Sequence, residues 1–312
     1  MNLSKLLQIY NLTDAEASDL SENETLHTAW KLKHTSGEYI LKRHTFPPEP
    51  SQTDKLNHSC RLMDHLYAHN FPCPKPIQNK HGKWFTEYEG HNYQIFTVLP
   101  GQIAWSNATA THQSQAGVLL GNFHRLQSDL PNIPPPKDLR ERISTGMERI
   151  VAEWDTFNMT RPDIRDAGAE ALSRIEPLWQ KLISLPNGFM HSDATPGNIL
   201  FDGDQLIGLI DFEVIPGPFL LDFGMAAIRW ASRFDDTTEI GRLDTNWLSM
   251  FLNAYTKARP FSPEEQNTLK DVLILAAIWS MSRQRTHRES DPAYRLTSRG
   301  EIYLAVKNLN LS

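Results

Sequence analysis

Polar and apolar residues alternate in short segments over the first hundred positions, which is typical of β-strands. HTAWKLKH (27–34) and EYILKRH (38–44) flank a glycine-containing turn and predict a β-hairpin. A second hairpin is predicted over 83–99, with its turn near Gly90. Between the hairpins, the apolar spacing predicts a helix over 54–70, which must end at the prolines of 72–76.

From about residue 100 onward, apolar residues recur at helical spacing. Helices are predicted over 116–127, 139–154, 165–183 and most of 221–309, whereas short strands return only at 199–201 and 206–211. The longest apolar run, 272–279, is far shorter than the ~20 residues that span a bilayer, so it predicts a buried helix. The pattern predicts an α+β fold with a small antiparallel-sheet lobe (1–99) and a large helical lobe (100–312).

Composition narrows the class of protein. The chain has 312 residues, of which 40% are hydrophobic and 22% charged, as in ordinary globular proteins. Its net charge of -6 disfavours a general nucleic-acid binder. Cys60 and Cys73 are its only cysteines and do not make a disulfide framework. Residues 1–12 have one apolar helical face and not the continuous core of a signal peptide, so we expect a cytoplasmic protein with no membrane contact.

The segment HSDATPGNILFDGDQLIGLIDF (191–212) carries the candidate chemistry. Pro196 and Gly197 favour a loop after Asp193, and Asn198 opens a short apolar strand. A turn at 203–204 leads to a second strand that ends at Asp211. If the two strands pair in antiparallel fashion, Asn198 and Asp211 lie side by side, with oxygen ligands of the kind that Mg²⁺ prefers. Asp193 is then available to accept a proton from a hydroxyl.

This arrangement is that of phosphoryl transfer, which also needs a strand lysine to neutralise phosphate. Lys42, in the predicted strand YILK, is the candidate. An H-x-D-x-x-x-x-N pattern alone is weak because aspartates near turns are common. Its combination with two inferred strands, the downstream Ile-Asp-Phe and the lysine strand is specific.

The same residues resemble the signature of the aminoglycoside phosphotransferase family. HSDATPGN (191–198) followed by IDFE (210–213) looks like its catalytic and metal-binding segments. Further similar segments are SENETLHTAWKL (21–32), EYILKRH (38–44), FTVLPG (96–101), LLGNFHRL (119–126) and GPFLLDFGMA (217–226). The family includes choline, methylthioribose and type II homoserine kinases, and it implies a protein-kinase-like fold with the active site in a cleft between the lobes.

The resemblance also implies roles for individual residues. Asp193 would be the catalytic base, Asn198 and Asp211 would bind Mg²⁺, and His191 and Asp222 would support the catalytic loop. The residues that it assigns to the nucleotide are Lys42 at the α- and β-phosphates, Ser21 and Thr25 in the nucleotide loop, and the backbone of Thr97 to Leu99 at the adenine.

Several positions depart from the pattern of the family. Many kinases pair the strand lysine with a helix glutamate, but the matching position is near Ser59, and Asp54 and Asp64 are one to two turns away. Ser192 stands where the family usually has glycine, and Thr195 where many kinases have a basic residue. Asp-Phe-Glu (211–213), closely followed by Gly217-Pro218, disfavours the activation segment of a protein kinase.

The sequence therefore predicts an ATP-dependent kinase for a small-molecule hydroxyl, acting as a monomer or homodimer. SENET, GLIDF and the missing helix glutamate resemble the homoserine-kinase branch and favour homoserine or another amino alcohol. An aminoglycoside phosphotransferase, a Ser/Thr protein kinase of the same fold and a non-catalytic nucleotide-binding regulator are the alternatives, although the intact Asp193, Asn198 and Asp211 argue against the last.

The charge of the acceptor stays open at this point. A solvated helical face is the default for the arginines of 283–295, but they also suit a pocket wall that grips a carboxylate or phosphate; they are Arg283, Arg285, Arg288 and Arg295. Asp235, Asp236 and Glu239 would instead attract an amine. His124, in an apolar helix, predicts a buried, hydrogen-bonded side chain and not a metal ligand.

Overall fold

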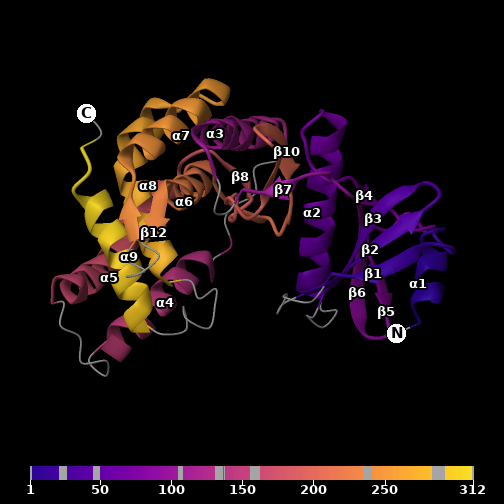
Figure 1. Cartoon of the computed structure of the whole chain (residues 1–312). Helices are drawn as coiled ribbons and strands as arrows, with labels where there is room; N and C mark the ends of the chain where they lie inside the picture. Colours follow the sequence, from indigo (N-terminus) through magenta and orange to yellow (C-terminus); the bar gives the residue numbers. More distant parts are fainter. Residues whose placement is uncertain are drawn as a thin grey trace. The chain divides into compact units, whose positions relative to one another are not determined.

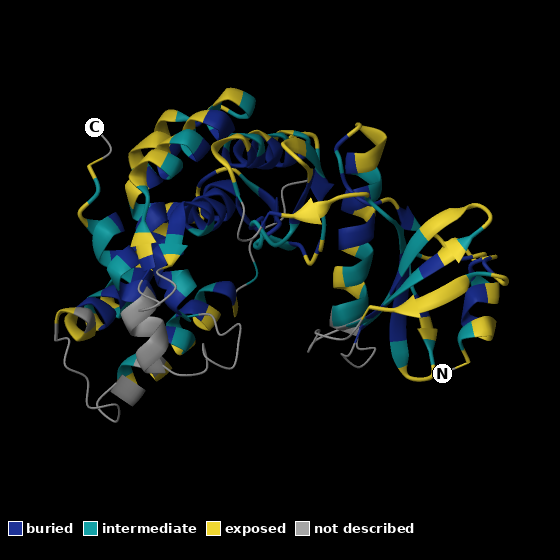
Figure 2. Cartoon of the chain, in the orientation of Figure 1, coloured by how far each residue is buried: buried dark blue, intermediate teal, exposed yellow. Residues whose placement is uncertain are grey.

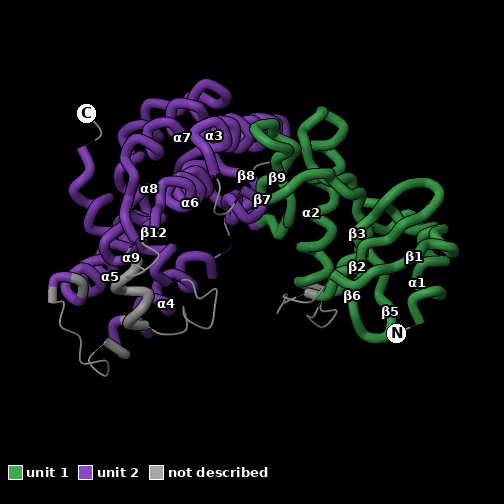
Figure 3. Tube along the Cα trace, viewed as in Figure 1, with its two compact units in different colours: residues 1–103, 199–214 green, residues 104–198, 215–312 purple. Residues whose placement is uncertain are grey.

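The structure, a computed structural model, describes residues 2–20, 27–44, 50–104, 108–130, 136, 138–154, 162–234, 241–282 and 292–310. Contacts divide the chain into two compact units, which Figure 3 distinguishes by colour. Unit 1 comprises residues 1–103 and 199–214, and unit 2 comprises residues 104–198 and 215–312. The sequence pattern assigned residues 199–214 to the helical lobe, whereas by contacts they group with the sheet-rich unit 1.

Unit 1 is built on an antiparallel sheet with strand order β1-β2-β3-β6-β4, to which β5 is added beside β6. Both predicted hairpins are present: β2 pairs with β3 around Gly37, and β5 pairs with β6 around Gly90 (Figure 1). The elements are α1 (Leu3–Ile9), β1 (Glu16–Asp19), β2 (His27–His34), β3 (Gly37–His44), α2 (Pro50–Ala68), β4 (Pro76–Ile77), β5 (Thr86–Tyr88), β6 (His91–Thr97), β7 (Gln102–Ile103), β9 (Ile199–Asp202) and β10 (Gln205–Leu209).

The two helices of unit 1 contact opposite faces of this sheet. Leu6 and Leu7 of α1 pack into one buried cluster with Leu41 of β3. On the other face, Gln94 of β6 donates from Nε2 to Cys60 Sγ of α2 at 3.0 Å. Because successive side chains of a strand point to opposite faces, Lys42, the neighbour of Leu41 and cross-strand partner of Gln94, lies on the α2 face. Cys60 and Cys73 are buried and free.

The hairpin of β9 and β10 explains why residues 199–214 belong to unit 1. In this hairpin Ile199 pairs with Leu209. Strand β9 also pairs with β7, and Leu209 N donates to Pro72 O at 2.9 Å. Antiparallel pairing across 199–209 was predicted, but β10 ends at Leu209, two residues before Asp211.

Unit 2 is helical, with two short antiparallel strand pairs, β8 with β11 and β12 with β13. These pairs were not predicted, because three or four residues are too few to show an alternating pattern. The helix that contains the apolar run 272–279 is buried from Val272 to Ile278, as expected, whereas Trp279 is partly exposed. The elements are α3 (Ala110–Arg125), α4 (Asp138–Trp154), α5 (Pro162–Leu182), β8 (Asn187–Met190), β11 (Ile215–Pro218), α6 (Phe219–Ala231), β12 (Ser232–Phe234), β13 (Gly241–Leu243), α7 (Thr245–Ala258), α8 (Pro263–Ser282) and α9 (Pro292–Lys307).

Helix α6 forms the centre of unit 2 and is almost entirely dark blue in Figure 2. Every residue of α6 except Arg229 is buried, including the charged Asp222. A helix that is apolar all round belongs in a core, so its few polar residues need a specific reason to be there. Among the described residues, no helix is both long and apolar enough to cross a membrane.

Helices α3 and α7 approach each other closely at two glycines of α3. A Cβ atom on Gly117 would lie 2.7 Å from Phe251 O, and one on Gly121 would lie 2.8 Å from Tyr255 O. Any larger side chain would therefore push the helices apart. This contact brings His124, one turn beyond Gly121, to Tyr255 of α7.

We expect Gly117→Ala to lower the free energy of unfolding by about 1–3 kcal/mol through overpacking against the α7 backbone. Helix propensity alone would favour alanine by about 1 kcal/mol, so the sign of the change is diagnostic. Denaturant unfolding followed by circular dichroism measures it. Val118→Ala, at the adjacent exposed position, is the control and should change stability by less than about 0.5 kcal/mol. A stabilised Gly117→Ala protein would contradict the close approach.

Candidate active site

The loop of residues 191–198 connects β8 to β9 and is held at its start by Asp222 of α6. Asp222 Oδ2 accepts from His191 N at 2.7 Å, and Oδ1 accepts from Ser192 N, also at 2.7 Å. Ser192 has φ +63°, a left-handed conformation that glycine adopts without strain. This backbone angle accounts for the glycine that the family usually has there. In this chain the two bonds to Asp222 hold a serine in that conformation.

His124 completes the shell of Asp222. It is buried, and its Nε2 lies 3.0 Å from Asp222 Oδ2. Burial lowers the pKa of His124 and outweighs the opposing effect of Asp222, so the ring is neutral near pH 7. A neutral ring donates from one nitrogen and accepts at the other: Nε2 donates to Asp222, and Nδ1 accepts from the Tyr255 hydroxyl at 2.7 Å. His124 is thus a hydrogen-bonded core residue, and that prediction is confirmed.

The buried hydrogen bonds continue beyond His124 through residues that the sequence did not mark. Arg259 donates from Nη1 to the Tyr255 hydroxyl at 3.3 Å and from Nη2 to Glu265 Oε1 at 2.9 Å. Glu265 is 1% exposed, and its other oxygen accepts from Ser262 N at 2.9 Å. Because each buried charge has a partner, the chain from Asp222 to Glu265 stays ordered at a tolerable desolvation cost.

The remainder of the 191–198 loop has its own anchors. Trp230 of α6 donates from Nε1 to Ala194 O at 3.0 Å. Asn198 Nδ2 donates to Asp193 O at 2.9 Å and to Asp193 Oδ2 at 3.0 Å, which fixes the orientation of that carboxylate. These bonds use only the nitrogen of the Asn198 amide and leave its oxygen, Oδ1, available as a ligand.

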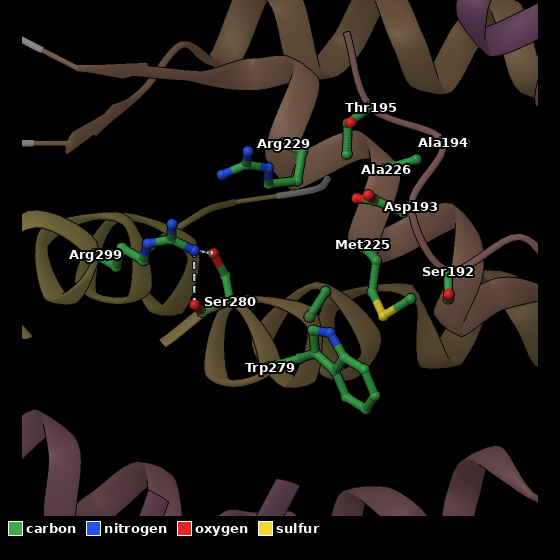
Figure 4. A pocket seen from close by; sticks show the side chains of 11 residues that line it. Ser192, Asp193, Ala194, Thr195, Met225, Ala226, Arg229, Trp279, Ser280 and Arg299 are labelled. Atoms are coloured by element: carbon green, nitrogen blue, oxygen red, sulfur yellow. Dashed lines mark hydrogen bonds between the residues drawn. The ribbon is translucent and has the colours of Figure 1, made fainter. Parts of the chain in front are cut away.

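A pocket opens beside Asp193, entirely within unit 2 (Figure 4). Its walls are the 191–198 loop and helices α6, α8 and α9. It measures about 360 Å³, counting the part that opens to solvent. The lining residues are Ser192, Asp193, Ala194, Thr195, Met225, Ala226, Arg229, Ala276, Trp279, Ser280 and Arg299.

In unit 1, Lys42 lies with two carboxylates from the segment after β10. Lys42 Nζ is 2.8 Å from Asp211 Oδ1 and 3.1 Å from Glu213 Oε1. Burial acts to lower the pKa of Lys42, but the two carboxylates outweigh it and raise the pKa above its ordinary value. The amine is therefore charged. Asp211 has φ +64°, an uncommon conformation for aspartate that is frequent where a side chain must be aimed.

Glu213 lies beside Lys42, whose expected acidic partner on helix α2 is absent. The α2 face beside Lys42 carries no acid at the expected position, where Ser59 is buried. Glu213, from a different segment, provides the second carboxylate near the amine. The sequence marked the missing helix acid but did not identify its replacement.

The residues predicted for the adenine lie at the end of β6 and just beyond. Thr97 N donates to Lys75 O at 3.0 Å, and Thr97 Oγ1 accepts from Lys75 N at 2.9 Å. Val98 N donates to Glu38 O at 3.3 Å. Leu99 lies against Gly208 of β10. Ser21 and Thr25 lie outside the described residues.

Residues 22–261 match the phosphotransferase enzyme family, APH. The chain belongs to this family. The match covers most of the chain and includes the 191–198 loop, Lys42, Asp211 and Asp222. The resemblance stated from the sequence is confirmed, and the protein is a phosphotransferase.

Two relatives of known name illustrate the similarity within this phosphotransferase family. The chain is 31% identical to the homoserine kinase of Afipia carboxidovorans over 210 residues, which is 67% of this chain and 61% of that relative. It is 29% identical to the homoserine kinase of Bradyrhizobium sp. (strain ORS 278) over 266 residues, which is 83% of this chain and 74% of the relative.

Solved structures of low sequence identity share the fold. The amicoumacin kinase complex with AMP-PNP, Ca²⁺ and Ami has a TM-score of 0.68 at 16% identity, covering 99% of this chain and 94% of that one. An aminoglycoside phosphotransferase from Alicyclobacillus acidocaldarius has a TM-score of 0.65 at 16% identity, covering 97% and 96%. With the antiparallel sheet and helical remainder, these confirm the predicted kinase-like α+β fold.

The pKa of His124 predicts how stability varies with pH. Because this pKa is lowered on folding, the unfolded chain takes up a proton below its ordinary value of 6.5 that the folded chain does not. Stability should therefore fall as the pH drops below 6.5, by up to about 1.4 kcal/mol per pH unit from this group. Denaturant unfolding between pH 7.5 and 5 measures it.

In His124→Gln this share of the pH dependence should disappear, although the variant is less stable at every pH. His69→Gln, at an exposed position in unit 1, should keep the slope of the unaltered protein. Equal slopes for His124→Gln and the unaltered protein would mean that His124 is protonated when folded.

Proposed function

We propose that this phosphotransferase moves the γ-phosphoryl group of ATP to a hydroxyl of a small molecule, homoserine or another amino alcohol. The observation that carries the proposal is the position of the Asp193 carboxylate at the pocket in unit 2. Asp193 is the one acidic side chain among the described residues that line the pocket in unit 2. A hydrogen bond from Asn198 fixes the orientation of its carboxylate. A carboxylate held in a fixed orientation beside a pocket is suited to accept the proton of a hydroxyl.

In the proposed reaction, Asp193 binds the acceptor hydroxyl and receives its proton as the oxygen attacks phosphorus. The new bond joins that oxygen to the γ-phosphorus, and the bond from the γ-phosphorus to the β–γ bridging oxygen breaks, so ADP leaves. Little covalent chemistry falls to the protein. Its contribution is to hold the hydroxyl and to stabilise negative charge on the phosphates.

Lys42 and Asp211 are proposed to act on the nucleotide. The Lys42 amine is charged and suits the α- and β-phosphates. Asn198 Oδ1 and the Asp211 carboxylate are hard oxygen donors and fit a divalent cation such as Mg²⁺. Asn198 directly precedes β9, and Asp211 follows the end of β10 by two residues. A bound Mg²⁺ would neutralise phosphate charge.

The hinge after β6 is proposed to contact the adenine. Since the N–H groups of Thr97 and Val98 are used by Lys75 and Glu38, pairing falls to Leu99 and to the carbonyl oxygens of the segment. The names of the relatives favour homoserine as acceptor, and the nucleotide analogue in the amicoumacin kinase complex favours ATP as donor.

We expect Asp193→Asn to lower kcat by about 10²- to 10⁴-fold, because the amide cannot accept the proton. Binding of the Mg²⁺ complex of ATP should be nearly unchanged. A coupled ADP-release assay and isothermal titration calorimetry measure the two effects. Asp202→Asn, at the exposed end of β9, is the control and should retain full turnover. Full activity in Asp193→Asn would overturn the assigned role.

Asp211→Ala should instead weaken nucleotide binding in the presence of Mg²⁺, because it removes the carboxylate proposed to hold the cation. Calorimetric titration with ATP, with and without Mg²⁺, separates the metal-dependent part. We expect the difference between the two titrations to shrink at least about tenfold, the effect of losing one charged interaction. If Asp193→Asn and Asp211→Ala weaken ATP binding equally, the two roles are wrongly divided.

A further inference from the structure

The residues that line the pocket in unit 2 indicate which chemical groups the acceptor has, which membership of the family alone does not. Its lining includes groups with no part in the proton transfer or the nucleotide. The pocket is open to solvent on one side. Three alanines, Ala194, Ala226 and Ala276, leave the space, while Met225 and Trp279 supply apolar surface.

The described lining of the pocket contains two arginines and one carboxylate. Figure 4 shows the side chains of Arg229 and Arg299 toward one end of the pocket and that of Asp193 toward the other. Arg229 comes from α6, two turns after Asp222, and is the residue of that helix that is not buried. An arginine placed there lies on the face that contacts the 191–198 loop, one turn beyond Met225 and Ala226.

Arg299 is fixed as part of the wall. It is 3% exposed, and its Nη1 donates to Ser280 O at 2.7 Å and to Ser280 Oγ at 2.9 Å. Ser280 provides neutral acceptors, and these two bonds orient the guanidinium. The field of a charge acts more strongly in a partly buried pocket than in bulk water. An anion is therefore favoured at this end of the pocket.

A buried hydroxyl adds an independent sign of a polar ligand. Thr195 lines the pocket and is 2% exposed, and its Oγ1 has no hydrogen-bond partner among the described residues. A buried hydroxyl rarely stays without a partner, because the loss costs about 1–3 kcal/mol. A polar group of a bound molecule would supply that partner.

From these contacts we infer that the acceptor is a small hydroxy acid, whose carboxylate is bound by Arg229 at the end of the pocket that Arg299 also lines. Its hydroxyl is then directed to Asp193. The fork of a guanidinium matches the two oxygens of a carboxylate. The inference rests on the proposed function and narrows it: an amino alcohol without a carboxylate, or a polycationic aminoglycoside, meets repulsion at Arg229. Arg229 is thus a specificity residue.

A series of acceptors that differ by one group tests the inference with the full chain. L-homoserine has both the amine and the carboxylate, 4-hydroxybutanoate lacks the amine, and 3-aminopropan-1-ol lacks the carboxylate. We expect kcat/KM to fall at least about tenfold more on loss of the carboxylate than on loss of the amine. Kanamycin should not be phosphorylated. Equal or better turnover of 3-aminopropan-1-ol or kanamycin would overturn the inference and leave the proposed kinase function intact.

Variants of Arg229 assign the effect to that residue. R229Q should raise the KM for homoserine about 10- to 100-fold and lower the preference for homoserine over 3-aminopropan-1-ol by a similar factor, while the KM for ATP stays within about twofold. R229K should recover part of the preference, since it keeps the charge without the fork. R125Q, at an exposed arginine that ends α3, is the control. A rise in the KM for ATP in R229Q would show that Arg229 serves the nucleotide instead.

Binding without turnover separates the two proposals. Calorimetry with homoserine in the presence of a non-hydrolysable ATP analogue should show binding that R229Q weakens about 10- to 100-fold. If no compound is phosphorylated but this Arg229-dependent binding is found, the proposed function fails and the carboxylate site stands. If neither homoserine nor 4-hydroxybutanoate binds, the inference fails.

Discussion

The hydrogen bonds of the Asp222 carboxylate hold the start of the 191–198 loop in unit 2. This carboxylate accepts hydrogen bonds from two consecutive loop N–H groups and from His124, and it is 1% exposed. The left-handed conformation of Ser192 costs roughly 1–2 kcal/mol relative to glycine. Hydrogen bonds to a charged group contribute about 1.5–3 kcal/mol each, so the two bonds to Asp222 are sufficient to offset that strain. A serine is therefore tolerated at this position, because the two hydrogen bonds to Asp222 fix the backbone of the loop.

This constraint extends through one face of α6. Residues 222, 225–226 and 229–230 recur at helical spacing, so they lie on the same side of the helix. Asp222 and Trp230 hold the 191–198 loop, while Met225, Ala226 and Arg229 line the pocket beside it. Helix α6, buried at every position except Arg229, therefore positions both the loop that carries Asp193 and the side chains that line the pocket beside it. Tyr255 binds His124 on the side away from Asp222 and is itself bound to Arg259, which pairs with Glu265. The close approach of α3 and α7 at the α3 glycines places His124 within hydrogen-bond distance of Tyr255.

The sequence predicted the long elements, for a physical reason. Helices and the β2–β3 hairpin have enough residues to show a period, whereas β8 and β11 to β13 have three or four and are defined by their partners. The sequence analysis expected Asn198 beside Asp211 and did not anticipate its hydrogen bonds to Asp193, although the two residues are only five apart in one loop. The partner of Lys42 could not be anticipated, because Glu213 is 171 residues away in the chain and only the tertiary fold brings the two together. Arg229 did leave a signal: with Asp222, it is one of two charged residues in the otherwise apolar FLLDFGMAAIRWA (219–231).

The pairing of Lys42 with two carboxylates also bears on how charge is distributed in this phosphotransferase. Asp211 and Glu213 together carry one more negative charge than Lys42 neutralises, and both side chains are partly exposed. A net negative group of this kind favours a cation. With a cation at Asp211, as proposed, Glu213 would remain as a carboxylate partner of the Lys42 amine. In kinases with a helix glutamate, that acid and the metal-binding aspartate come from different elements, whereas here Glu213 and Asp211, the residue proposed to hold the cation, lie in one short segment after β10. Because Asp211 and Glu213 both contact Lys42, a substitution at either position alters the electrostatic surroundings of the lysine.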